Sequence, residues 1–213
     1  MAADDEGNDV TAVAVPVTGS IGIAPAGTAL PTPLEGADPD FVLPVAWKKL
    51  GLIKVDGGPQ WAWAADGDPI KFWQDGYSIP SGLANVTLVI SAAQTDENVR
   101  AIIYGKTADA NGYLTVDGGG NALVYEVFTE EIFKNGVIRR RVAPNVTVQE
   151  VAEDQSTRGE VLGYAITFAV ARSAEVENNH FGEWLIPADD GVGTLSVEAT
   201  GDQSGSEEDE AAA

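Results

Sequence analysis

The stretch Val161–Ala171, VLGYAITFAVA, decides the fold class because its side chains alternate strictly in size. Large apolar residues occupy every second position, and small residues fill the positions between them. Since side chains of a β-strand point alternately to opposite faces, this pattern predicts a strand with one core-facing side. Antiparallel sheets with one buried face are typical of it. The predicted core face consists of Leu162, Tyr164, Ile166, Phe168 and Val170.

Other segments with strand-like composition lie on both sides of this stretch. LANVTLVIS, residues 83–91, also alternates, with Val86, Leu88 and Ile90 on one face. Together with a short helix, a total of about seven to nine strands predicts a mainly β protein, an antiparallel β-sandwich or barrel with one short flanking α-helix. The shorter strand candidates are Leu50–Val55, Val146–Val151, His180–Ile186 and Thr194–Ala199.

The helix is expected in QTDENVRAIIYG, residues 94–105. Thr95 is a suitable N-cap, and the acidic residues after it suit the positive end of the helix dipole. Gly105 supplies a C-terminal stop. A helix this short needs packing against a sheet for its stability. The apolar stripe for that packing is Val99, Ile102 and Ile103.

The dipeptide Asn135-Gly136 is the strongest turn pattern in the chain. A two-residue type I′ loop at this position places Glu131 opposite Arg140 and Glu130 opposite Arg141. The arginine triplet 139–141 then has acidic partners on the adjacent strand, and a salt bridge to another subunit stays open as the alternative. Arginines that alternate between the faces of a strand do not form one nucleic-acid-binding patch.

The two ends of the chain differ in composition from the middle. Residues 1–44 are predicted to form an N-terminal arm, with an acidic beginning and a Pro- and Gly-rich remainder, because Pro16 interrupts the alternation of VTAVAVPV. Residues 45–200 are expected to hold the β-sandwich domain. Residues 201–213, GDQSGSEEDEAAA, are expected to be a disordered acidic tail.

Composition excludes several classes of function. The chain of 213 residues has no cysteine and one histidine, so it offers no Cys nucleophile, no Cys-ligated metal and no multi-histidine site. With 12 Lys and Arg against 33 Asp and Glu, its net charge of −21 argues against tight binding to DNA phosphates. No apolar run approaches the roughly 20 residues of a membrane span, and the acidic N-terminus does not resemble a secretory signal. We therefore expect neither an enzyme nor a cofactor.

An unusual cluster of aromatic residues lies within a segment broken by Gly67, Pro69 and Gly76. Two interpretations stay open: the rings cap the core of their own domain, or they pack on another subunit, since exposed apolar patches mark interfaces. The cluster consists of Trp61, Trp63, Phe72, Trp73 and Tyr77.

Several stretches, taken in order, resemble the major tail proteins, or tail tube proteins, of long-tailed bacteriophages, especially those of actinobacterial hosts. The resemblance covers roughly residues 18–172. The segments that carry it are GSIGIAPAGTALPT, WKKLGLIKVDGG, AWAADGDPIKFW, NVRAIIYGK, RRRVAPNVTVQEV and GEVLGYAITFAV.

The resemblance implies a non-enzymatic virion component, assembled in the bacterial host cytoplasm. Its subunits would form rings, usually hexameric, that stack head-to-tail around a tape-measure protein and meet terminator and baseplate proteins at the tube ends. DNA would pass through the lumen without binding, and an acidic wall suits that passage. The ring-stacking elements implied are the arm Gly19–Pro33, with Ile21, Ile23 and Pro25, and the aromatic loop Gly57–Tyr77.

Two other classes remain as alternatives. One is a carbohydrate- or receptor-binding β-sandwich module whose aromatic loop docks a ligand. The other is a different virion component, such as a tail terminator or a head decoration protein, which would form closed rings that do not polymerise.

Overall fold

A computed structural model of the chain describes residues 5–118 and 121–188. The predicted strand Thr194–Ala199 and the predicted tail 201–213 lie outside the described residues. The elements, in chain order, are η1 (Val10–Ala12), β1 (Pro16–Pro25), α1 (Pro33–Ala37), β2 (Lys48–Lys49), β3 (Gln60–Asp66), β4 (Ile70–Lys71), β5 (Ser78–Ile79), β6 (Leu83–Ala92), α2 (Glu97–Tyr104), β7 (Val124–Phe133), β8 (Ile138–Glu153), β9 (Tyr164–Val170), η2 (Ala174–Val176) and β10 (Gly182–Ile186).

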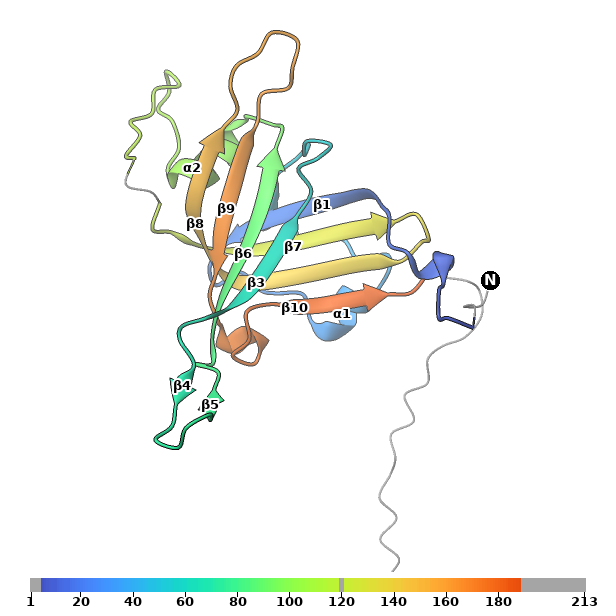
Figure 1. Ribbon diagram of the computed structural model, residues 1–213. Coiled ribbons are helices and arrows are strands. Elements are labelled where there is room, and N and C mark those ends of the chain that lie inside the picture. Colours follow the sequence, from blue (N-terminus) through green and yellow to red (C-terminus); the bar gives the residue numbers. More distant parts are fainter. Residues whose placement is uncertain (1–4, 119–120, 189–213) are drawn as a thin grey trace, which may run out of the picture.

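The mainly β, antiparallel class is confirmed. One sheet has the strand order β2-β1-β7-β8-β9-β6-β3, with β10 added beside β8, and β4 and β5 form a separate two-stranded ribbon. The sheet is folded on itself: β1, β7 and β10 cross the page in Figure 1, whereas β9, β6 and β3 run steeply up it. The main core lies where these two groups of strands meet, as in an orthogonal sandwich.

The long strand β8 connects the two groups. Its first part pairs with β7 and β10, and its second part pairs with β9. Register shifts interrupt the pairing with β7 between Tyr125 and Val127 and the pairing with β9 between Val148 and Glu150. Such bulges bend a strand and also accommodate Pro144, which has no N–H to donate to a ladder. The bend in β8 therefore turns one sheet into two layers.

The predicted alternation of β6 and β9 is confirmed, except that β9 begins at Tyr164, so Leu162 of the predicted core face lies outside the strand and is half-buried. In β9, Tyr164, Ile166, Phe168 and Val170 are buried, and the small residues between them are half-buried. In β6, Val86, Leu88 and Ile90 point into the same core. Burying each of these side chains contributes about 1.5–3 kcal/mol to folding.

The predicted helix is also confirmed as α2. Val99, Ile102 and Ile103 form its buried stripe, and Gly105 ends it in the left-handed conformation. The N-cap is Asp96 instead of Thr95, because the Asp96 side chain accepts the Val99 N–H at 3.0 Å.

The extended-arm prediction is wrong for residues 16–25. These residues form β1, which pairs with β7 along its length and with β2 near its end. Pro16 is tolerated because it occupies the first position of the strand. A five-residue helix, α1, follows in the same segment. Thr32 and Glu35 form its capping box, and Pro33 occupies its first turn.

The predicted strand Leu50–Val55 is also wrong. The chain turns at Gly51, where φ is +75°, and the segment makes only an isolated bridge at Ile53. Its backbone is bonded elsewhere: Leu50 N–H donates to the Ile21 carbonyl, and Leu52 N–H donates to the Gln94 side chain. Residues 50–59 are therefore a loop that leads into β3.

Candidate assembly surfaces

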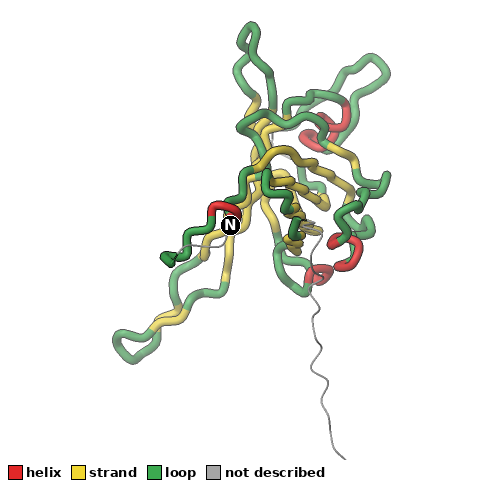
Figure 2. The backbone as a smooth tube through the Cα atoms, turned by 90° about the vertical axis from the view of Figure 1, so that its right-hand side faces the viewer, coloured by secondary structure: helices red, strands yellow, loops and turns green. Residues whose placement is uncertain are grey.

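The β3–β6 hairpin, residues 60–92, extends beyond the body of the sheet. β3 and β6 pair from Gln60 opposite Val89 to Asp66 opposite Leu83. Beyond that point the chain continues into a tip, residues 67–82, where β4 pairs with β5. In Figures 1 and 2 the tip projects well away from the other strands.

Four of the five clustered aromatic residues lie exposed on this hairpin. The exposed fractions are 61% for Trp63, 49% for Phe72, 99% for Trp73 and 70% for Tyr77. Ile70, Ile79 and Leu83 add further exposed apolar surface. Because soluble monomers seldom expose contiguous apolar patches of this kind, the tip is a candidate contact surface.

Trp61 differs from the other four, because it is half-buried, although the ring of Trp63 also lies 6.1 Å from that of Phe181. The ring of Trp61 lies 4.8 Å from the ring of Phe181, and the Arg141 guanidinium lies 5.6 Å from the Trp61 centroid. Trp61 also contacts the main core as a half-buried side chain. Capping of the domain's own core therefore fits Trp61. Packing on another subunit stays open for the exposed side chains of the tip.

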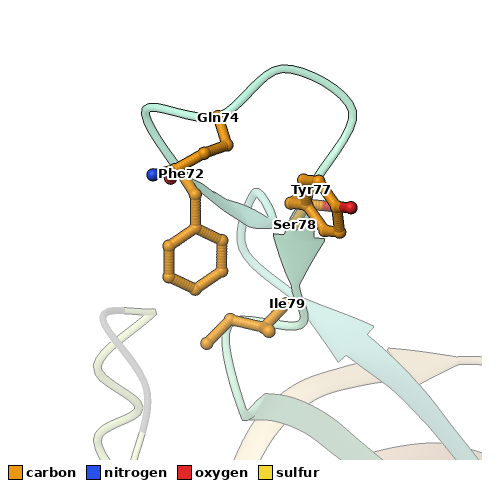
Figure 3. A pocket seen from close by; sticks show the side chains of 5 residues that line it. All are labelled: Phe72, Gln74, Tyr77, Ser78 and Ile79. Atoms are coloured by element: carbon orange, nitrogen blue, oxygen red, sulfur yellow. The ribbon is translucent and has the colours of Figure 1, made fainter.

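The tip has a hollow between its two short strands. Phe72 N–H donates to the Tyr77 carbonyl at 3.2 Å, which closes the ribbon. Phe72 and Ile79 point toward each other below this bond in Figure 3. The hollow has a volume of about 430 Å³ and is lined by Phe72, Gln74, Tyr77, Ser78 and Ile79.

A groove lies at the opposite end of β3. It has a volume of about 590 Å³ and runs between the first half of β1 and the loop 51–59. Its exposed apolar side chains are Val17, Leu52 and Val55. Asp56, Glu130 and Glu131 also line it.

The predicted register of the hairpin at Asn135-Gly136 is wrong by one residue. Glu130 lies opposite Arg140, and Glu131 lies opposite Arg139. Only Gly136 has a positive φ, +82°, so the turn is not type I′, which needs positive φ at both central residues. Phe133 instead closes a three-residue loop by hydrogen bonds with Gly136 and Val137.

All three arginines of the triplet have carboxylate partners, but the pairs differ from those predicted. Arg139 makes two hydrogen bonds of 2.9 Å to Glu131. Arg140 Nε donates to Glu130 at 2.7 Å, and Arg141 Nε donates to Glu183 on β10. The triplet therefore connects three adjacent strands, β7, β8 and β10.

Arg140 has a second role, which the sequence did not indicate. Its side chain is 1% exposed, and its guanidinium donates to the backbone carbonyls of Gly36, Asp38 and Pro39. Phe41 lies against the guanidinium, 5.6 Å away. Trp184 Nε1 donates to the Pro33 carbonyl on the same segment. Arg140 thus holds residues 33–41 on the outer face of the sheet, over a second small apolar cluster formed by Ala24, Trp47, Phe128 and Val142.

The proposed contact role of Ile21 and Ile23 is wrong. Both side chains belong to the main core, with exposed fractions of 3% and 2%, so they are not available to another subunit. The cause is the inclusion of β1 in the sheet. Pro25, at the end of β1, is exposed.

Glu126 is fully buried on β7, next to the bulge opposite β8. One carboxylate oxygen accepts the Gly27 N–H at 2.7 Å, and the other has no partner among the described residues. Burial raises the pKa of this carboxyl, and the nearby Glu175 raises that pKa further. The arrangement holds the turn after β1 against β7.

Sequence reasoning missed three of these features: the groove, the Arg140 clamp and buried Glu126. The groove is formed by segments distant in sequence, so no local pattern could have revealed it. A capping box at Thr32 and Glu35 could have revealed α1, and with it a folded segment above Arg140. The sequence around Glu126 contains no comparable pattern that would indicate that this side chain is buried.

The described residues contain no group of three or more His, Asp or Glu side chains placed to hold a metal ion. Within that same part of the chain, no helix has the length and apolar character needed to cross a membrane.

A protein-family model described as "Phage tail tube protein" matches residues 6–190. No curated protein matches the chain. The family match includes the folded sheet, the β3–β6 hairpin and the groove, and it covers far more than half of the sequence. The chain belongs to the phage tail tube protein family and is a structural component of a phage tail.

Proposed function

We propose that the chain assembles into rings, hexameric by analogy with long-tailed phages of actinobacterial hosts, and that these rings stack head-to-tail into a hollow tube. The observation that carries this proposal is the uncovered aromatic tip of the β3–β6 hairpin. A tip that projects from one end of the subunit can reach the next ring. Such a head-to-tail contact joins two different surfaces, does not close, and so generates a filament.

The tube encloses a tape-measure protein during assembly in the bacterial cytoplasm, and terminator and baseplate proteins close its ends. DNA later passes through its lumen without binding. Support for this part is the net charge of −21 per subunit, since an acidic wall repels phosphates. The subunit acts by packing and repetition and performs no catalysis.

Negative-stain microscopy of concentrated protein tests the proposal. We expect tubes from the wild type, and fewer or shorter tubes from Tyr77→Ala. Tyr113→Ala is the matched control, because Tyr113 is exposed to nearly the same degree, 68% against 70%, on a loop away from the hairpin. Monomers that never assemble, even with a tape-measure partner, would count against a tube subunit.

Two other outcomes would support different functions. Binding of a glycan by a monomeric protein, abolished by Tyr77→Ala, would favour a carbohydrate- or receptor-binding module. Closed rings that never stack would favour a terminator or decoration protein.

A further inference from the structure

The aromatic tip and the groove lie at opposite ends of the same strand. Residues 51–59 precede β3, and the tip, residues 67–82, follows it. In Figure 1 the teal loop before β3 lies at the upper end of that strand, and β4 and β5 lie beyond its lower end. Both ends expose apolar side chains, whereas the strand between them is held in the sheet by β6.

The groove has the dimensions needed to hold part of the tip. Its volume of about 590 Å³ falls within the range of roughly 300–1,000 Å³ that is usual for pockets holding organic ligands. A single indole or phenyl ring is smaller than such ligands. Trp73 is 99% exposed and is therefore free to enter a neighbouring surface without repacking its own domain.

One ion pair can form between the two ends, although the tip also carries Asp68 and Asp75. Lys71 is the single cation of the tip and is exposed, with no ion pair among the described residues. Asp56 lines the groove, is exposed, and forms no ion pair within the same part of the chain. A contact between the two ends can therefore pair these charges at its rim.

We infer that the groove between β1 and the loop 51–59 is the acceptor surface for the hairpin tip of a second copy of this chain. Trp73 and Phe72 of one copy pack on Leu52 and Val55 of the next. Because one contact surface differs from the other, every bound copy still presents a free groove or a free tip. This inference rests on the proposed tube function and names the surface at which successive rings meet.

Two single variants separate the two sides of this contact. Val55→Asp places a charge in the groove, and Trp73→Asp places one on the tip; both side chains are exposed, so each variant should fold with a wild-type melting temperature. We expect each variant alone to form no tubes. Val45→Asp is the matched control, since Val45 is 91% exposed outside the groove and the tip, and it should form tubes as the wild type does.

Mixing the two variants gives the decisive measurement. The tip of the Val55→Asp protein is intact and should bind the intact groove of the Trp73→Asp protein, but the complex cannot grow further. Analytical ultracentrifugation should therefore detect paired rings and nothing longer. Wild-type tubes from Val55→Asp, or loss of tubes in Val45→Asp as well, would overturn the inference. Because the variants are compared with a polymerising wild type, absence of wild-type tubes would instead refute the proposed function.

The geometry also limits the axial repeat. At about 3.3 Å per residue, the chain from Gln60 to Phe72 spans at most about 40 Å. If the tip of one copy occupies the groove of the next, the axial repeat of the tube cannot greatly exceed that length. A repeat several times longer, measured by electron microscopy, would exclude this contact.

Discussion

The molecule contains two long antiparallel hairpins that differ in how far their side chains are buried. In the β7–β8 hairpin, Tyr125, Val127 and Phe128 are buried, and Glu130 and Glu131 are paired with arginines of the adjacent strand. In the β3–β6 hairpin, the four aromatic side chains beyond Trp61 are exposed, and of these Trp63 has a ring contact with Phe181. Both hairpins have strand-forming sequences, so local propensity does not explain the difference.

The comparison shows where each hairpin finds its packing partner. The β7–β8 hairpin lies in the middle of the strand order, between β1 and β9, and its residues are therefore surrounded. β3 lies at the end of the strand order, and its hairpin continues past the sheet. Exposed aromatic side chains at that position fit a protein whose packing is completed by other copies. Four substitutions test this contrast.

The largest effect is expected from Phe128→Ala. Phe128 is 2% exposed and packs against Phe41 and Trp47, so its truncation leaves a cavity in the second apolar cluster. We expect the free energy of unfolding to fall by about 3–5 kcal/mol. Urea denaturation of the subunit measures this loss, and a change below about 1 kcal/mol would contradict the assigned packing.

Arg140→Ala should have the next largest effect and lower the free energy of unfolding by about 3 kcal/mol. The substitution leaves three backbone carbonyls and the Glu130 carboxylate without their buried donor. Arg139→Ala is the comparison variant, because Arg139 also loses a carboxylate partner, the buried Glu131, but makes no hydrogen bond to residues 33–41. Faster proteolysis within residues 33–41 of Arg140→Ala, but not of Arg139→Ala, would sharpen the assignment of Arg140 as the clamp.

Glu126→Gln should produce a smaller change that depends on pH. Because the folded-state pKa of Glu126 is raised, its contribution to stability is complete below the unfolded pKa, near 4.5, and is lost as the pH rises through the folded pKa. Glutamine stays neutral and can still accept the Gly27 N–H. We expect equal melting temperatures near pH 4 and a variant more stable by a few degrees near pH 8. A pH-independent difference would show that desolvation of the carboxylate is not the cause.

The smallest effect on stability is expected from Trp73→Ala. The side chain is 99% exposed, so the free energy of unfolding of the subunit should stay within about 0.5 kcal/mol of the wild type. Assembly should weaken nevertheless, because the proposed contact lies between copies. Thermal unfolding of the monomer and electron microscopy of the assembled protein separate the two properties. A strongly destabilised monomer would show that the tip belongs to the core of its own domain.

The sequence by itself determined the elements whose burial follows a regular period. The strands 83–92 and 164–170, with their core faces, and the helix 97–104, with its stripe, follow from alternation or from helical spacing. The position of the turn at Asn135-Gly136 was also predicted correctly. Its type was not, and the strand register, which pairs Glu130 and Glu131 with arginines, therefore differs by one residue. An Asn-Gly dipeptide is compatible with more than one loop length and turn type, so the sequence alone does not determine the backbone angles of the turn.

Only the tertiary structure decided the features that join distant segments. Pro16 suggested an arm, but pairing with β7 makes residues 16–25 a strand and buries Ile21 and Ile23. The arginine triplet suggested one partner per side chain, but the fold brings residues 36–39 over Arg140. The groove exists because β1 and the loop 51–59 lie side by side. The physical reason is the same in each case: local patterns encode the period of burial, whereas the neighbour that buries a residue is set by long-range packing.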